Sequence, residues 1–422
     1  MVERIPCRNL DCTNTILPAT AEQTGGLCMP CVQAAAKRDR EAYIQLNRRD
    51  VNEFEGITDA VEILKILHRP RPFDPLVNWI PPATPTDRLY AALSQAQQQA
   101  LATYAESLIN RDRIKEAEEI TLCLAAFTDD PLETCLKALV DRDIFSPSLA
   151  FSRASSDLRD QLIARIETEA EQCHQLLRAL AWIGDETVVE LFQGWQQSPP
   201  PWRESLYVPP QDYAYEAGWE LDDNGQRRDL YFHTCTQLVS VDSAFTGQFN
   251  AIAEREDCCP WCQQSLINLV DLVPAEFGLV ELGDRCDRLQ VTTCDICTTY
   301  DIIFGSCDRA GRGQWSRFNA QSDDPPDDAE DWERLPNHSL VPAGRRSPLF
   351  AADQFLPTRF SQLGGHPTWI QEADYPHCPA CHQTMMFLAQ VDWEDVDEDG
   401  EGLLYAFVCP DCRTTATEYQ QT

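Results

Sequence analysis

The sequence predicts an α+β protein of several domains: a small N-terminal zinc module, an α-helical region, and a C-terminal, duplicated, mainly β domain with two zinc sites of four cysteines each. Three observations support this fold class. Twelve of the 19 cysteines fall into three spaced sets of four. Apolar residues recur every three or four positions in the middle of the chain. Strand-like apolar runs flank the later cysteine pairs. The length of 422 residues is enough for two or three domains.

The composition predicts a cytoplasmic protein with no membrane partner and no direct contact with nucleic acid. Apolar residues make up 43% of the chain, yet no stretch approaches the roughly 20 apolar residues that span a membrane. The opening MVERIPCRNLDC carries charges and a cysteine where a signal peptide has its apolar stretch. The net charge of −34 opposes binding to phosphates, because that binding requires basic side chains.

Residues 1–50 are predicted to form a zinc-ribbon-like module. A C-x4-C pair and a C-x2-C pair stand fifteen residues apart, and two such pairs can supply the four ligands of one zinc ion. The four cysteines are Cys7, Cys12, Cys28 and Cys31. Residues 51–84 follow as a Pro-rich connector, because the stretch 68–87 should run irregularly.

Residues 85–200 are expected to be helical. In the run LLRALAWIGDETVVELFQGW, one helix ends at Gly184 and the next begins after Asp185, a residue type favoured as an N-cap. This hinge resembles that of HEAT-type repeats, whose helix pairs stack into curved arrays with protein-binding surfaces. We therefore predict α-helical HEAT-like repeats, against the alternative of an ordinary helical domain.

Residues 205–422 are predicted to form one β domain with two zinc sites. Each site would use two CxxC pairs, CPWC with CDIC and CPAC with CPDC, separated by 31 and 27 residues. The eight predicted ligands are Cys259, Cys262, Cys294, Cys297, Cys378, Cys381, Cys409 and Cys412. Cys258 can take the place of Cys259 in a C-x3-C pair. Cys259 is preferred because CPWC then matches the other pairs.

Structural zinc is the expected cofactor of all three sets, with up to three ions in the chain. Four thiolates complete a tetrahedral site and leave no position for a catalytic water. A redox CxxC pair should open a helix, whereas MMFLAQV after CPAC is typical of a strand. Of the other cysteines, Cys123, Cys135 and Cys173 are expected in helix cores, and Cys235, Cys286 and Cys307 are either core residues or spare thiols.

The two later cysteine sets belong to an internal repeat of about 120 residues. CPWCQQSLINLVDL (259–272) parallels CPACHQTMMFLAQVDW (378–393), and each second pair follows a β-rich run, LQVTTCDIC or LYAFVCPDC. The repeat predicts one domain built from two related halves. Each half should contain β-hairpins that zinc holds at their base.

The stretch FSQLGGHPTWIQEADYPHCPACHQTMMFLAQVD (360–392) resembles the YwqG-like proteins, which are grouped with programmed cell death protein 2. The resemblance covers roughly 205–422 and is strongest at Gly364, Gly365, Pro367 and Trp369. It implies a duplicated β-rich domain and protein binding. Its bacterial members are grouped with immunity proteins, and its eukaryotic members resemble dedicated chaperones for a ribosomal protein.

We expect no catalytic residues and no enzyme activity. Phosphate-binding, dinucleotide-binding, metalloprotease and hydrolase motifs are absent from the sequence, and His233 and His366 are more typical of hydrogen-bonded structural residues. The resemblance and the acidity, including tracts at 322–333 and 392–401, predict a bacterial immunity protein. It would bind a basic, cytosol-acting toxin domain one-to-one and occlude its active site. The alternative is a chaperone or adaptor for a basic protein such as a ribosomal protein.

Overall fold

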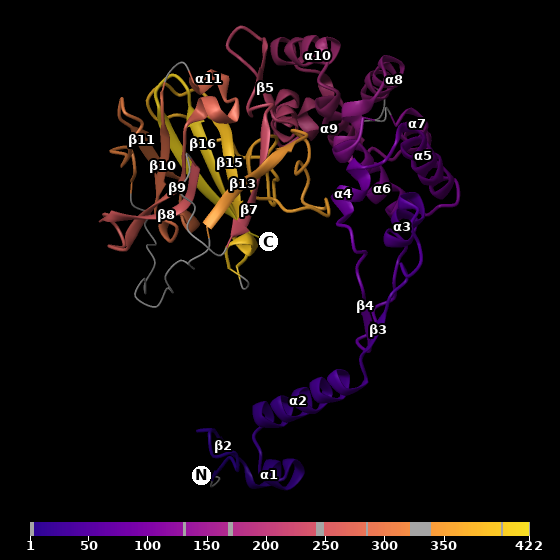
Figure 1. The fold of residues 1–422 in the computed structure, drawn as a ribbon, viewed down its shortest axis with the longest axis vertical. Helices are drawn as coiled ribbons and strands as arrows, with labels where there is room; N and C mark the ends of the chain where they lie inside the picture. Colours follow the sequence, from indigo (N-terminus) through magenta and orange to yellow (C-terminus); the bar gives the residue numbers. More distant parts are fainter. Residues whose placement is uncertain are drawn as a thin grey trace. The chain divides into compact units, whose positions relative to one another are not determined.

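The computed structural model describes residues 4–129, 132–167, 172–241, 249–283, 286–320, 339–397 and 400–421. The chain divides into two compact units, Met1–Pro85 and Thr86–Thr422. The second unit combines a set of helices with β-sheets (Figure 1), so the mixed α+β class is confirmed. The acidic tract at 322–333 lies outside the described residues.

The first unit opens with the predicted cysteine-rich module. Two of its cysteines, Cys7 and Cys12, lie between the strands of a two-stranded hairpin, and the other two, Cys28 and Cys31, lie at the start of the longer of two helices. The elements of this unit are β1 (Ile5–Pro6), β2 (Thr15–Ile16), α1 (Pro18–Thr24), α2 (Met29–Asn47), β3 (Arg49–Val51), α3 (Ala60–Leu67) and β4 (Val77–Trp79).

The segment 51–84 is more ordered than the irregular connector that its prolines predict. Helix α3 begins after Asp59, whose side chain accepts a hydrogen bond from the Val61 N–H, and it buries the apolar side of AVEILKIL. Strand β4 pairs in parallel with β3. The prolines follow α3 and lie on either side of β4, so they limit the helix and the strand without preventing them.

The described residues between 86 and 200 are mainly helical, as predicted. The helices are α4 (Thr86–Ala91), α5 (Gln95–Ile109), α6 (Ile114–Phe127), α7 (Glu133–Val140), α8 (Ser156–Ile166), α9 (Cys173–Ile183) and α10 (Glu186–Gln197), with a 3-10 turn, η1, at Ser148–Arg153. Gly184 ends α9 with φ of 49°, and the Asp185 side chain accepts a hydrogen bond from the Val188 N–H at 3.0 Å. The predicted hinge is therefore present. Stacking of the helices as HEAT-type repeats stays a prediction.

Two antiparallel sheets form the β region. One has three strands in the order β10 (Leu289–Thr293), β9 (Ser265–Leu272) and β8 (Phe249–Cys258). The other has the order β12 (Gly313–Trp315), β11 (Ile303–Cys307), β17 (Thr414–Gln420), β16 (Leu403–Cys409), β15 (Met386–Asp392), β14 (Gln362–Gly364), β7 (Cys235–Val241) and β13 (Ser339–Arg346). A separate hairpin of β5 (Trp219–Leu221) and β6 (Arg227–Asp229) precedes them, and α11 (Val280–Gly283) lies between β9 and β10.

The internal repeat is visible in the order of elements. In each half a CxxC pair leads into a strand, then a 3-10 turn, then an antiparallel strand that ends at the second pair. The corresponding hairpins are β9–β10 and β15–β16, and the turns are η5 (Pro274–Phe277) and η8 (Trp393–Asp395). The halves then diverge: β17 pairs with β16 of its own half, whereas β11 pairs with β17 of the other.

The central strands are buried on both faces, because each face packs into a different core. Along β16, Leu404, Ala406 and Val408 join residues of the three-stranded sheet in one apolar cluster. The alternate residues Tyr405 and Phe407 join a second cluster on the opposite face, as the two-residue period of a strand requires. Trp369 is partly buried against this second cluster and stacks on Tyr405 with ring centroids 5.1 Å apart.

Gly364 and Gly365 adopt positive φ, with values of 66° and 73°, a conformation that glycine accommodates without steric cost. A Cβ atom on Gly364 would lie 2.0 Å from the Thr234 carbonyl oxygen. We therefore expect Gly364→Ala to lower the free energy of unfolding by at least about 2 kcal/mol, since the left-handed conformation alone costs roughly 1–2 kcal/mol for other residues. Urea titration measures this loss. Gly344→Ala, with open space around its Cβ position, is the control, and an equal effect of both changes would contradict the argument.

Candidate metal centres

The structure brings together the four cysteines of each predicted set. In each quartet the sulfur atoms all lie within 4.8 Å of one another. The quartets are Cys7, Cys12, Cys28 and Cys31; Cys259, Cys262, Cys294 and Cys297; and Cys378, Cys381, Cys409 and Cys412. The cysteines that were grouped by their spacing in the sequence therefore lie close together in space, although the two CxxC pairs of the later quartets are about 30 residues apart.

The distances between sulfur atoms fit a tetrahedral metal site. Sγ–Sγ separations are 3.6 Å for Cys12 and Cys28, 3.5 Å for Cys262 and Cys294, and 3.7 Å for Cys381 and Cys409. Four Zn–S bonds of about 2.3 Å place the sulfurs about 3.8 Å apart. A disulfide would bring two of them to about 2.05 Å. The residues present thus fit a zinc ion with four thiolate ligands.

Each CxxC pair is closed by the same type of backbone hydrogen bond. The N–H four residues after the first cysteine donates to the carbonyl oxygen of that cysteine at 2.8–3.0 Å. The donors are Val32, Gln263, Thr298, His382 and Arg413. Three of these residues, Gln263, His382 and Arg413, adopt positive φ. This turn directs both sulfur atoms of a pair to the same side of the backbone.

The strand register decides between Cys258 and Cys259. Cys259 is buried in the second quartet, whereas Cys258 is exposed at the end of β8 and pairs with Ser265. His377 precedes the third quartet in the same way, because it pairs with Thr384 across the corresponding turn. Cys258 therefore occupies the position of His377, outside the quartet.

Amide groups donate hydrogen bonds to the sulfur atoms of the first quartet. The spacing of the cysteines did not predict these donors. The Asn9 and Asn14 side chains donate to the sulfurs of Cys31 and Cys28, at 3.4 and 3.7 Å. The Cys28 N–H donates to the sulfur of Cys7 at 3.2 Å. Hydrogen bonding from the Cys31 backbone lowers the pKa of the Cys28 thiol to about 6. These donors favour the thiolate form that a metal requires.

A threonine network joins the second quartet to the other half of the repeat. The Thr293 hydroxyl lies 2.7 Å from that of Thr298 and 2.5 Å from that of Thr417. Thr293 and Thr298 flank the CDIC pair, and Thr417 lies on β17, which continues from the CPDC pair. The two quartets are thus linked through buried hydroxyls as well as through the β11–β17 pairing.

The cysteines outside the quartets, and His233 and His366, make contacts typical of structural residues. Cys123, Cys135 and Cys173 are buried in helices as predicted; Cys235 and Cys286 are buried, and Cys307 is partly buried. His366 is fully buried between Trp182 and Tyr231, and burial lowers the pKa of its imidazole to about 4. His233 is exposed, with its Nε2 2.7 Å from a carboxylate oxygen of Asp229.

The fold and the quartets define a protein whose β region carries two thiolate sites able to hold structural metal, with a third in the N-terminal unit. A family model described as "Domain of unknown function (DUF1963)" matches residues 361–422. The chain is also similar to the "Uncharacterized protein YpfL" of Salmonella typhimurium (strain LT2), with 49% identity over 426 residues that covers 100% of both chains. The chain therefore belongs to the same family as YpfL. No solved structure matches it.

None of the helices in the described ranges has the length and apolar character needed to cross a membrane.

Proposed function

We propose that this protein is a bacterial immunity protein that acts in the cytoplasm without catalysis. It binds a cognate, cytosol-acting antibacterial toxin one-to-one and occludes the toxin's active site. Zinc ions in the three cysteine quartets hold the N-terminal module and both halves of the β region in shape. Because four thiolates close each site, the metals support the binding surface and take no part in chemistry.

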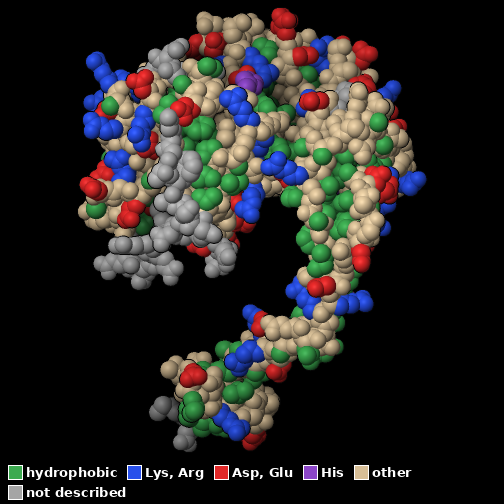
Figure 2. Space-filling view, viewed as in Figure 1, with side chains coloured by type: hydrophobic (Ala, Val, Ile, Leu, Met, Phe, Trp, Pro, Cys, Tyr) green, Lys and Arg blue, Asp and Glu red, His purple; other side chains and the backbone are tan. Residues whose placement is uncertain are grey.

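The distribution of charge carries this proposal. Residues 1–85 contain 10 basic and 11 acidic residues, whereas residues 86–422 contain 24 basic and 57 acidic residues. On the face drawn in Figure 2, acidic and basic side chains are interspersed, so no single patch of that face holds the excess acid. A negative field of this strength attracts a basic protein and repels nucleic acid. Toxins that act on nucleic acid or nucleotides have basic clefts that such a partner can fill.

The architecture supports binding to a protein. The α9–α10 pair, with its Gly184–Asp185 hinge, fits a HEAT-like array, and such arrays present extended binding surfaces. The β region fits the duplicated domain of the YwqG-like proteins, which the resemblance groups with immunity proteins. The same resemblance favours an alternative partner, a basic housekeeping protein such as a ribosomal protein, for which this chain would act as a chaperone or adaptor.

Isolation of the tagged protein from its own cells at moderate salt tests the proposal. We expect mass spectrometry to identify one basic toxin domain in a one-to-one complex, and we expect the purified chain to abolish that toxin's activity. Because the attraction is electrostatic, the association rate should fall at least tenfold between low and high salt. A ribosomal protein in place of the toxin would establish the alternative. A complex in which the toxin stays active would refute neutralisation.

A further inference from the structure

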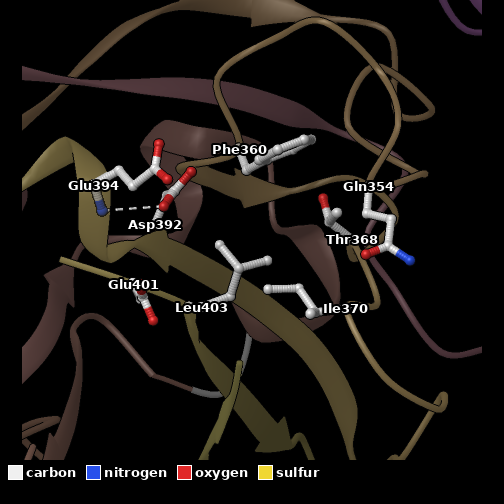
Figure 3. Close-up of a pocket in the computed structure, with 9 residues that line it drawn as sticks. Gln354, Phe360, Thr368, Ile370, Asp392, Glu394, Glu401 and Leu403 are labelled. Carbon is white, nitrogen blue, oxygen red and sulfur yellow. Dashed lines mark hydrogen bonds between the residues drawn. The ribbon is translucent and has the colours of Figure 1, made fainter. Parts of the chain in front are cut away.

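A small pocket opens at the end of the β15–β16 hairpin. Its volume is about 270 Å³, below the range of roughly 300–1,000 Å³ for drug-sized ligands, so it suits a single side chain. Figure 3 shows the apolar side chains of Ile370 and Leu403 along it and the ring of Phe360 across from them. The lining also includes the carboxylate-bearing residues Asp392, Glu394 and Glu401, together with Gln354, Thr368 and Gly402.

The acidic residues of this pocket form no salt bridge within the described part of the chain. Asp392, Glu394 and Glu401 make no ion pair with any residue in the described ranges. The nearby guanidinium of Arg359 pairs with Asp395 instead. Burial raises the pKa of the Asp392 carboxyl to about 6. A cation that entered the pocket would compensate for this loss of hydration.

The fold does not require acid at these positions. In the first half of the repeat, the residues that correspond to Asp392 and Glu394 are Val273 and Ala275, counted from the first cysteine of each half. Val273 precedes η5 without a side-chain cap, whereas the Asp392 side chain accepts a hydrogen bond from the Glu394 N–H at the start of η8. The same strand and turn thus form with apolar residues in one half and with carboxylates in the other. The charges of the second half are therefore available for binding.

The geometry favours an organic cation over a metal ion. Among the described residues, the side chains that gather closely enough to share one metal ion are the three cysteine quartets, and these carboxylates do not form such a group. A guanidinium can bridge the wider spacing, because it carries five N–H donors on a planar, extended group. Its plane also stacks on aromatic rings, and its aliphatic stem suits the walls formed by Ile370 and Leu403.

We propose that this pocket receives an arginine side chain of the bound protein. The assignment rests on the proposed function for the identity of the partner, and it adds the residues that recognise it. The guanidinium lies between the Asp392 and Glu394 carboxylates and the Phe360 ring. Its stem displaces water from the apolar walls.

A titration without the partner tests the pocket directly. The probe is N-acetyl-argininamide, added to the zinc-loaded full chain with ¹³C-labelled Ile and Leu methyl groups; N-acetyl-citrullinamide is the uncharged control. We expect saturable shifts of the Ile370 and Leu403 methyl resonances with the arginine compound only. The double variant Asp392→Asn, Glu394→Gln should weaken binding at least tenfold. The Asp392 carboxylate accepts a hydrogen bond from the Glu394 backbone N–H at 3.1 Å, and the side-chain oxygen of an asparagine can still accept it.

Glu276→Gln is the matched control, since Glu276 is an exposed acid on η5. It should leave the titration unchanged, and all variants must keep the wild-type metal content and melting temperature. If the double variant fails that check, Glu401→Gln replaces it, with a smaller but measurable weakening expected. Absence of shifts at Ile370 and Leu403, or equal shifts with citrullinamide, would overturn the assignment.

Binding measurements with the co-purified partner test the arginine assignment and the proposed function separately. With a co-purified partner, the double variant should increase the dissociation constant at least tenfold, and Glu276→Gln should not. If the partner binds wild type and double variant equally, the arginine assignment fails while the proposed function stands. If no partner binds but argininamide still titrates, the proposed function fails while the pocket's selectivity for a guanidinium stands.

Discussion

Cys381→Ser is expected to remove one of three equivalents of zinc and to unfold the C-terminal half of the β region. The Cys381 sulfur lies 3.7 Å from that of Cys409 in the third quartet. Cys381 is nevertheless exposed, so serine removes a ligand without leaving a buried cavity. Structural zinc contributes about 10–16 kcal/mol of apparent binding free energy in small domains, which is comparable to the whole stability of a typical domain, about 5–15 kcal/mol.

Cys258→Ser provides a closely matched control for this experiment. Cys258 is also exposed and adjoins a CxxC pair, but it lies outside the quartets. Elemental analysis should find two zinc ions per chain in Cys381→Ser and three in Cys258→Ser, and only the first should lose its cooperative unfolding transition. Cobalt substitution of the wild type should give the intense absorption of four thiolate ligands at each site. Unchanged metal content in Cys381→Ser would refute the third site.

The cysteine positions were predictable because the chemistry of a CxxC turn is local. Two residues between cysteines fix a turn closed by one backbone hydrogen bond, and that turn directs both sulfurs to the same point whatever the rest of the sheet does. The hairpins were predictable for the same reason, since apolar runs on either side of each pair have the two-residue period of strands. The match of CPWC with CPAC also identified Cys259 as the member of the quartet.

The order of strands was not predictable in the same way. β14 pairs with β7 at Gly364 and Cys235, and β11 pairs with β17 at Ile303 and Thr417. These partners are more than 100 residues apart in the sequence, so their pairing depends on packing across the whole sheet. Helix α3 was not predicted, because the prolines that follow it indicated an irregular segment. The acidic pocket forms only when β15, β16 and the segment around Phe360 come together, so Asp392 appeared in the sequence merely as part of an acidic tract.

Trp219 joins strand β5 to helix α9, and we expect its truncation to have the second large effect. Trp219 is fully buried, and its Nε1–H donates to the Ala181 carbonyl at 2.8 Å. This oxygen lies in the last turn of α9, where helix carbonyls lack partners within the helix. Arg227 donates to the carbonyl of Gly184 in the same region and lies over the Trp219 ring. One side chain from β5 thus caps α9 and fills the space beside it.

Trp219→Ala should lower the free energy of unfolding by about 3–5 kcal/mol, the usual cost of truncating a buried aromatic residue. It also leaves the Ala181 carbonyl without its donor. The helices and the β region should then unfold in separate transitions, which circular dichroism at 222 nm and tryptophan fluorescence can resolve in one urea titration. Trp202→Ala is the control, because Trp202 is only partly buried and packs edge-on against Trp195. If both variants keep a single transition of wild-type midpoint, the cap on α9 does not couple the two regions.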